Sequence, residues 1–211
     1  MARSIAVLSG LVAGAFAASF FPGAAARARE TDVNVARDQA AQLGDDAPPL
    51  EISTLEGDVV SIAKLRGRVV ILDFFATWCA PCHRALADML AARCAAGLDA
   101  LVVLIDQGEP PELVGRWASA QARLPPGTRI ALDPNGDVAR RWGARRLPTT
   151  FIVDATGKVK HINRGWGDGY GARLTRWLRA IAAGTPAAVG VAAPASLPGC
   201  PAPATPAPHA P

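Results

Sequence analysis

The alternation of apolar and polar residues in the middle of the chain predicts a β-sheet. Two continuous apolar runs, 69–75 and 100–105, are typical of strands that are covered on both faces. Two shorter runs, 50–53 and 59–62, alternate around the turn residues Glu56-Gly57-Asp58 and predict a β-hairpin. The remaining expected strands are 129–132, 149–153 and 159–162. The last two flank a short turn and should pair as antiparallel neighbours.

Helical spacing of apolar residues fills the gaps between these strands. Apolar residues recur every three or four positions, and two of the segments begin beside a proline, which suits the first turn of a helix. The expected helices are 80–95, a segment that begins at Pro110, 138–142 and 171–183. Because helices alternate with the early strands and an antiparallel hairpin follows, we expect an α/β fold. It would have a mixed central sheet with helices on both faces, plus an N-terminal β-hairpin.

The two ends of the 211-residue chain differ from this middle part. Arg3 precedes an apolar or small stretch, 5–21, and Ala26-Arg27-Ala28 fits a signal-peptide cleavage site. An uncleaved membrane anchor is the alternative, because the stretch has the minimum length for a membrane span. We expect a signal peptide or anchor at 1–28, a linker at 29–46, the folded domain at 47–183 and an Ala/Pro-rich disordered tail at 184–211. Behind either leader the domain would face an oxidising periplasmic or other extracytoplasmic space.

Composition and charge argue against one class of partner. The formal net charge is +4 and no run of basic residues occurs, so we expect no nucleic-acid partner. Half of the residues are apolar, which is enough for a hydrophobic core of ordinary size.

The candidate chemistry lies between the first long strand and the first long helix, in Trp78-Cys79-Ala80-Pro81-Cys82-His83. The strand would hold Cys79 at the edge of the sheet. Pro81 suits the first turn of a helix, because its missing N–H costs nothing there. Cys79 would then lie at the helix N-terminus, where unpaired backbone N–H groups favour a thiolate. Since a thiolate is the species that attacks a disulfide, the motif favours a redox-active Cys79–Cys82 pair.

Zinc binding and a purely structural disulfide are the alternative uses of such a pair. Zinc would need two more ligands at compatible spacing, but Cys94 and Cys200 stand alone and the three histidines are far apart in sequence. A structural bridge rarely follows a tryptophan at a strand-to-helix turn. We therefore expect a redox site with no metal and no cofactor.

The chain resembles the TlpA/ResA-like group of exported thioredoxins over roughly residues 47–183. The resemblance rests on the segments 65–70, 74–82 and 147–159, in this order and spacing. It implies the thioredoxin fold and the activity of a thiol–disulfide oxidoreductase. It also implies partners: disulfide-bearing exported proteins, which the enzyme would reduce, and a membrane thiol carrier, which would supply the electrons.

Two other functions stay open beside the reductase. A disulfide oxidase or isomerase is the first, but Ala80-Pro81 is closer to the Gly-Pro of thioredoxin than to the Pro-His of DsbA, which favours the reductase. A copper-binding protein on a thioredoxin scaffold is the second. Such a protein would need a CxxxC spacing or a Met- and His-rich patch, whereas this chain has a CxxC and two Met residues.

The resemblance assigns roles to the residues of the motif. Cys79 would attack the client disulfide and form a mixed disulfide with the client. Cys82 would resolve it and leave both cysteines oxidised. Trp78 would flank the active site, and the intervening Ala80 and Pro81 would contact the substrate.

The same resemblance singles out a second segment. Pro148 matches the family's cis-proline, which packs against the active-site disulfide, although cis is the minority isomer overall. Leu147 would present its backbone to an extended client peptide. Arg146, where glycine is common, would lie near Cys79 and lower the pKa of its thiol or favour acidic client loops; a solvated surface charge is the alternative. Ala85 replaces an acidic residue of many relatives, which argues against a role in cytochrome c maturation.

Asp73 lies six residues before Cys79, at the place where ordinary thioredoxins have a buried aspartate that accepts the proton of the second cysteine. The exported relatives often have asparagine there. Burial in an apolar strand raises the pKa of a carboxyl group, which suits acid–base work near neutral pH. The alternative is a buried aspartate that only binds a neighbour.

Three further residues carry open expectations. In an oxidising compartment Cys94 and Cys200 would pair and hold the tail against the domain. Alternatively, Cys94 is a buried apolar residue and Cys200 is free or intermolecular. His83 would tune the acidity of the neighbouring Cys82 or simply face solvent.

Overall fold

The computed structural model describes residues 40–121, 124–184 and 200. The expected signal peptide or anchor at 1–28 lies outside these residues, as do most of the expected linker and nearly all of the expected tail. Within the described ranges, no helix is both long enough and apolar enough to cross a bilayer.

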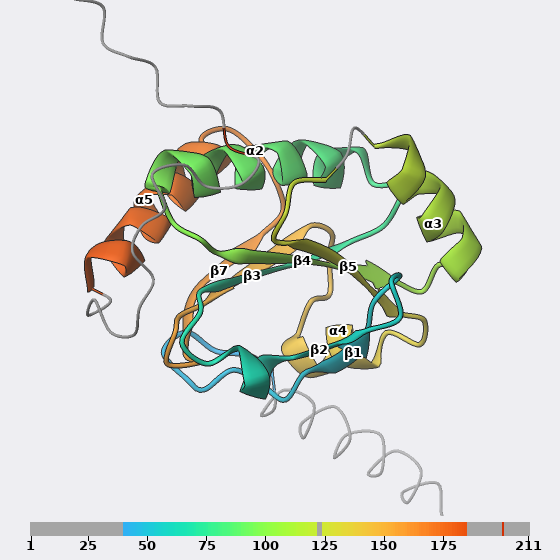
Figure 1. The fold of residues 1–211 in the computed structure, drawn as a ribbon, viewed down its shortest axis with the longest axis horizontal. Coiled ribbons are helices and arrows are strands. Elements are labelled where there is room, and N and C mark those ends of the chain that lie inside the picture. Colours follow the sequence, from blue (N-terminus) through green and yellow to red (C-terminus); the bar gives the residue numbers. More distant parts are fainter. Residues whose placement is uncertain (1–39, 122–123, 185–199, 201–211) are drawn as a thin grey trace, which may run out of the picture. The chain divides into compact units, whose positions relative to one another are not determined.

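A five-stranded mixed sheet forms the centre of the domain (Figure 1). Its strands are β3 (Val70–Phe75), β4 (Leu101–Gln107), β5 (Thr128–Asp133), β6 (Thr149–Val153) and β7 (Val159–Arg164). They lie in the order β5-β4-β3-β6-β7. Parallel pairing joins β3 to β4 and β4 to β5, whereas β6 runs antiparallel to both β3 and β7. The mixed sheet expected from the sequence is confirmed.

The N-terminal hairpin is also present, as a separate sheet. β1 (Glu51–Ser53) pairs antiparallel with β2 (Val59–Ser61). The expected strand at 59–62 was one residue too long, because Ile62 begins the 3₁₀ helix η1 (Ile62–Leu65). The N–H of Ile62 still donates to the carbonyl of Leu50, and the tight helix then buries the Ile62 side chain in the core.

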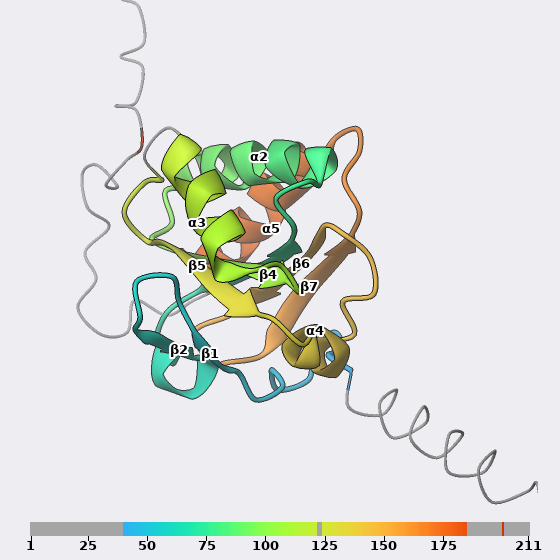
Figure 2. The ribbon, with the colours of Figure 1, turned by 90° about the vertical axis from the view of Figure 1, so that its right-hand side faces the viewer.

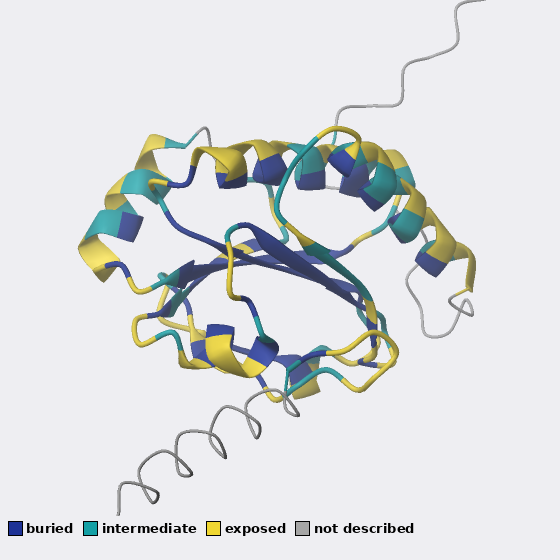
Figure 3. Cartoon of the chain, turned by 180° about the vertical axis from the view of Figure 1, so that it is seen from behind, coloured by how far each residue is buried: buried dark blue, intermediate teal, exposed yellow. Residues whose placement is uncertain are grey.

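Helices cover both faces of the central sheet, as expected (Figure 2). One face carries α2 (Ala80–Ala96), α3 (Pro111–Ala120) and α5 (Tyr170–Gly184). The other face carries α4 (Asp137–Trp142) and the hairpin. Seen from behind, the central strands β3, β4 and β6 are almost wholly buried, the edge strand β7 is mostly half-buried, and the outer sides of the helices are exposed (Figure 3). Each face of the sheet therefore has its own hydrophobic core.

β3 lies at the centre of this arrangement, and all six of its residues are buried. Successive side chains of a strand point to opposite faces. Ile71 and Phe75 accordingly join the core beneath α2 and α5, whereas Leu72 and Phe74 join the core beneath α4. The same alternation places Asp73 on the α2 and α5 side, which is also the side of the CxxC pair.

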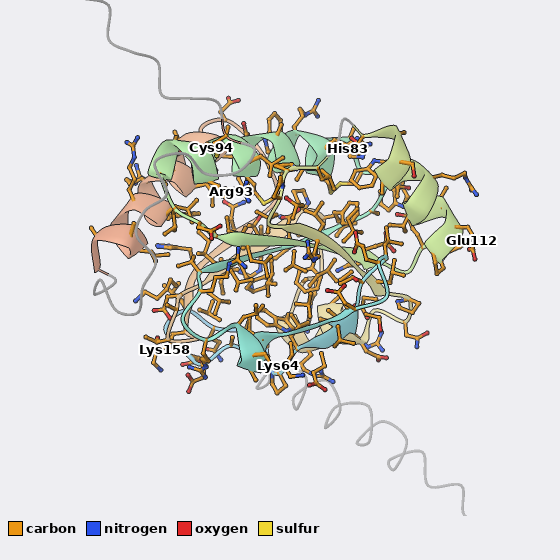
Figure 4. All side chains as sticks on the ribbon, in the orientation of Figure 1. Lys64, His83, Arg93, Cys94, Glu112 and Lys158 are labelled. Atoms are coloured by element: carbon orange, nitrogen blue, oxygen red, sulfur yellow. A yellow bond between two sulfur atoms is a disulfide. The ribbon has the colours of Figure 1, made fainter. Side chains whose placement is uncertain are left out.

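A second disulfide joins Cys94, in the last turn of α2, to Cys200. This confirms the pairing expected of the two cysteines outside the CxxC, and none of the four cysteines is free. Cys94 and His83 lie near opposite ends of the same helix (Figure 4). The bridge therefore holds Cys200 at the end of α2 that is remote from the CxxC.

Oxidised protein that is unfolded in denaturant is expected to contain no free thiol, because all four cysteines are paired. Alkylation followed by mass spectrometry counts the free thiols. The matched control is Cys200→Ser, which should show one thiol, that of Cys94. Two alkylated thiols in the natural sequence would reject the second bridge.

Candidate active site

The turn between β3 and α2 positions the CxxC pair. Cys79 is the N-cap residue of α2, and its backbone N–H donates to the carbonyl of Ala76 at 3.1 Å. Pro81 lies in the first turn of the helix, where no N–H partner is needed. Cys79 and Cys82 are joined by a disulfide. Cys79 therefore lies at the N-terminus of α2. Once the disulfide is reduced, the helix dipole stabilises negative charge on the Cys79 sulfur.

The two cysteines and the preceding tryptophan differ sharply in exposure. Cys79 and Cys82 are only 4% and 2% exposed, whereas Trp78 is 74% exposed. Ala80 and Pro81, also expected to contact substrate, are exposed on the same turn. A large exposed indole beside a nearly buried disulfide is a surface on which a client protein can pack.

The loop before β6 reaches the same edge of the sheet. The Leu147–Pro148 peptide bond is cis, the isomer that the resemblance implies. The Pro148 carbonyl accepts a hydrogen bond from the N–H of Gly165 at 2.7 Å. Because Thr149 pairs with Phe74, the next residues out, Pro148 and Phe75, lie at the strand ends that lead to the CxxC turn. Pro148 is buried, Leu147 is half-buried and Arg146 is exposed.

Asp73 lies fully buried in the middle of β3, with 0% of its surface exposed. Burial raises the pKa of its carboxyl group to about 7, against a smaller lowering by a hydrogen bond from Thr150. The hydroxyl of Thr150 donates to Oδ1 of Asp73 at 2.7 Å, across the β3–β6 pair. The Thr150 hydroxyl lies 2.8 Å from the hydroxyl of Tyr170, the first residue of α5. A carboxyl with this pKa can take or give a proton near neutral pH.

The structure adds a residue that sequence reasoning missed, Glu109. Its carboxylate accepts hydrogen bonds from the backbone N–H and the hydroxyl of Thr77, the latter at 2.6 Å. Thr77 lies two residues before Cys79, so Glu109 holds the active-site turn from the β4–α3 loop. Burial favours the neutral form of Glu109, but the hydrogen bonds from Thr77 outweigh it and lower the pKa.

Glu109 is itself coupled to a second buried carboxyl, that of Asp106. The N–H of Glu109 donates to Oδ2 of Asp106 at 3.0 Å. Burial and the neighbouring Glu109 raise the pKa of Asp106 to about 7. The only sequence signal for this pair is an aspartate at the end of the buried strand β4, three residues before a glutamate.

His83 has a definite partner on the neighbouring helix α3. The indole N–H of Trp117 donates to Nε2 of His83 at 3.2 Å, and the two rings stack with centroids 5.6 Å apart. This hydrogen bond requires Nε2 to be unprotonated. His83 is exposed, as the solvent-facing alternative expected, and its ring also packs against Trp117.

Two further expectations concern what the site lacks or replaces. Among residues 40–121, 124–184 and 200, no group of three His, Cys, Asp or Glu side chains is arranged to hold a metal ion. Ala85, which replaces an acidic residue of many relatives, is fully buried in the core beneath α2.

A CxxC disulfide at a helix N-terminus, directly after the central strand of a mixed sheet and beside a cis-proline loop, defines a class of enzyme. The protein is a thioredoxin-fold thiol–disulfide oxidoreductase.

Comparison with known proteins agrees with this class. The chain matches the AhpC/TSA family over residues 43–162. It is 34% identical to thiol-disulfide oxidoreductase ResA of Geobacillus thermodenitrificans, over 60% of this chain and 71% of the relative. A thiol:disulfide interchange protein of Chlorobium tepidum has a similar structure, with a TM-score of 0.55 and 25% identity over 67% of this chain and 99% of the other. An exposed lipoprotein thioredoxin of Streptococcus pneumoniae has a TM-score of 0.50 and 25% identity, over 61% and 97%.

The chain therefore belongs to the AhpC/TSA family, and within it to the TlpA/ResA-like thioredoxins.

Proposed function

We propose that this oxidoreductase works outside the cytoplasm and reduces disulfides of exported client proteins. The observation that carries the proposal is the position of Cys79 at the N-terminus of α2, beside an exposed Trp78. The helix N-terminus favours the thiolate of Cys79 over that of Cys82, which lies one turn deeper. Cys79 is therefore the nucleophile, and Trp78 contacts the client.

Reduction takes two exchange steps. The Cys79 thiolate attacks one sulfur of the client disulfide, forms a mixed disulfide and releases the other client sulfur as a thiolate. Asp73 then accepts the proton of the Cys82 thiol. The Cys82 thiolate attacks the Cys79 sulfur, forms the Cys79–Cys82 disulfide and expels the second client thiolate. Two electrons pass from the dithiol to the client, and the client thiolates take up protons.

The client segment would bind between the CxxC turn and the cis-proline loop. Leu147 supplies backbone groups to an extended peptide, as an added strand does. Ala80 and Pro81 form the opposite wall. The exposed guanidinium of Arg146 favours acidic client segments.

The N-terminal apolar stretch supports the proposed location, and the need to re-reduce the active-site disulfide supports the proposed electron donor. The apolar stretch 5–21 fits export or anchoring, and one structural relative is described as an exposed lipoprotein. In an oxidising space the Cys79–Cys82 disulfide must be re-reduced after each turnover. A thiol carrier in the membrane would deliver those electrons across it.

The direction of exchange is tested by the midpoint potential of the Cys79–Cys82 couple. We expect a value near that of thioredoxin, about −270 mV, because Ala80-Pro81 resembles the thioredoxin dipeptide. Trp78 fluorescence in dithiothreitol buffers reports the fraction of the Cys79–Cys82 pair that is reduced. Acid-quenched alkylation gives an independent count of the reduced thiols. A value near that of DsbA, about −120 mV, would instead make the protein a disulfide donor.

The second disulfide needs its own control in this experiment. A Cys94→Ser/Cys200→Ser double variant keeps the active-site pair and removes the other bridge. It should give the same potential as the natural sequence. A different value would show that the titration had measured both disulfides together.

A further inference from the structure

Three buried groups from three elements form a hydrogen-bonded chain that ends on Asp73. Asp73 belongs to β3, Thr150 to β6 and Tyr170 to α5, and their contacts are 2.7 and 2.8 Å long. A carboxylate only accepts hydrogen bonds, so the single hydroxyl proton of Thr150 points to Asp73. Tyr170 must then donate its proton to Thr150. The chain thus has one direction, from Tyr170 through Thr150 to Asp73.

The two oxygens of Asp73 have different surroundings. Oδ1 accepts the hydrogen bond of Thr150. Oδ2 is equally buried, and no other described residue gives it a hydrogen bond. A buried polar atom without a partner is costly and calls for an explanation. In the oxidised protein the sulfur of Cys82, on the same side of the sheet, is held in the disulfide and carries no proton to donate.

The outer end of the chain stays protonated. Tyr170 is 1% exposed, and burial together with the charge of Asp73 raises the pKa of its hydroxyl above the ordinary value. Asp88 on α2 raises this pKa further, and Arg173 on α5 lowers it. On β4 the residue opposite Asp73 is the apolar Leu104. Tyr170 therefore acts as a permanent donor rather than as a group that titrates.

We propose that Thr150 and Tyr170 are positioning residues for disulfide exchange: they fix Oδ1 of Asp73 and leave Oδ2 as the oxygen that takes the proton of Cys82. The inference rests on the proposed role of Asp73 as proton acceptor. It adds that two residues remote from the CxxC in sequence set the pH at which the resolving step becomes fast.

Removing the donors should make the carboxylate less stable. Thr150→Val deletes the hydrogen bond to Oδ1, so the pKa of Asp73 rises and the resolving step moves to higher pH. We expect a shift of about one pH unit, the size that corresponds to one hydrogen bond to a charged group. Tyr170→Phe should shift the midpoint in the same direction but less, because Thr150 keeps its own bond. Thr150→Ser keeps a hydroxyl and should restore most of the natural midpoint.

The resolving step is measured with dithiobis(nitrobenzoate) as the probe disulfide. Reduced protein releases one coloured thiolate when Cys79 attacks and a second when Cys82 resolves. Stopped-flow traces across the neutral pH range give the midpoint of the second phase. Carbon-13 NMR of labelled aspartate carboxyls in the oxidised protein measures the pKa of Asp73 directly, with the signal assigned through Asp73→Asn.

Control variants separate this inference from the proposed function. Thr128→Val removes another buried threonine hydroxyl, one with no hydrogen-bond partner among the described residues, and should shift neither readout.

If Asp73→Asn slows the second phase while Thr150→Val and Tyr170→Phe keep the natural midpoint and pKa, the positioning role is wrong and Asp73 remains the acceptor. An unchanged second phase in Asp73→Asn would reject both roles, whereas the first phase would still test Cys79. Tyr170→Phe loses only one hydroxyl, so it decides the case if Thr150→Val does not fold.

Discussion

Cys79→Ser is expected to abolish reduction of a client disulfide, whereas Cys82→Ser is expected to stop halfway and accumulate a mixed disulfide. Cys79 lies at the N-terminus of α2, where backbone N–H groups stabilise its thiolate. In Cys79→Ser the remaining Cys82 thiol is 2% exposed and lacks this position. We expect the first exchange step to slow by at least about 100-fold, because both thiolate character and access are lost.

Mass spectrometry after mixing with dithiobis(nitrobenzoate) separates the two cysteines. Cys82→Ser should release one equivalent of coloured thiolate and retain one on Cys79. The natural dithiol should release two equivalents and retain none. The Cys79→Ser/Cys82→Ser double variant is the matched control, because it keeps the Cys94–Cys200 bridge and shows any reaction there.

The same variant identifies clients. When it is expressed in place of the natural protein, Cys82→Ser should be found covalently linked to client proteins by mixed disulfides that dithiothreitol breaks. The double variant should be linked to none. If the trap formed on Cys79→Ser instead, the roles of the two cysteines would be reversed. The client sequences would also test the proposal that Arg146 favours acidic segments.

Much of the fold and the centre of the site could be predicted because their signals are local. The apolar run of β3 is long enough to mark a central strand, and Pro81 marks the first turn of the following helix. The spacing of Cys79 and Cys82 places both at that turn. The cis bond before Pro148 came from family resemblance, since the residues alone favour the trans isomer.

The partners of Asp73 could not be predicted in this way. Thr150 lies 77 residues from Asp73 in sequence, and only the register of β3 against β6 brings them together. Alternation fixes the register of a strand when one face is exposed, but all five residues of β6 are buried. The role of Glu109 was not predicted for a related reason: its contact with Thr77 depends on how the β4–α3 loop packs against the active-site turn.

Replacing Asp73 with asparagine is expected to stabilise the protein, and the gain should grow with pH. The folded-state pKa of Asp73 is about 7, above its ordinary value of 3.8, because the carboxyl is buried. Between these two values the folded protein binds more protons than the unfolded chain. The free energy of unfolding therefore falls as pH rises through this window. A shift of about 3 units corresponds to about 4 kcal/mol, which is the upper limit for the gain above neutral pH.

Urea unfolding of both proteins with their disulfides intact measures this difference across the window. Near pH 4 the two free energies of unfolding should be close, and near pH 8 Asp73→Asn should be the more stable by up to about 4 kcal/mol. Asp106, whose pKa is also raised to about 7, adds the same trend to both proteins and cancels in the difference.

Asp168→Asn, at an exposed carboxylate, serves as the control and should change stability little at either pH. A difference that does not vary with pH would mean that Asp73 has the same pKa in the folded protein as in the unfolded chain, and it would remove the physical basis for its role as proton acceptor. A growing difference, together with a slower resolving step in Asp73→Asn, would show that the fold tolerates a destabilising carboxyl in its core because the exchange reaction uses it.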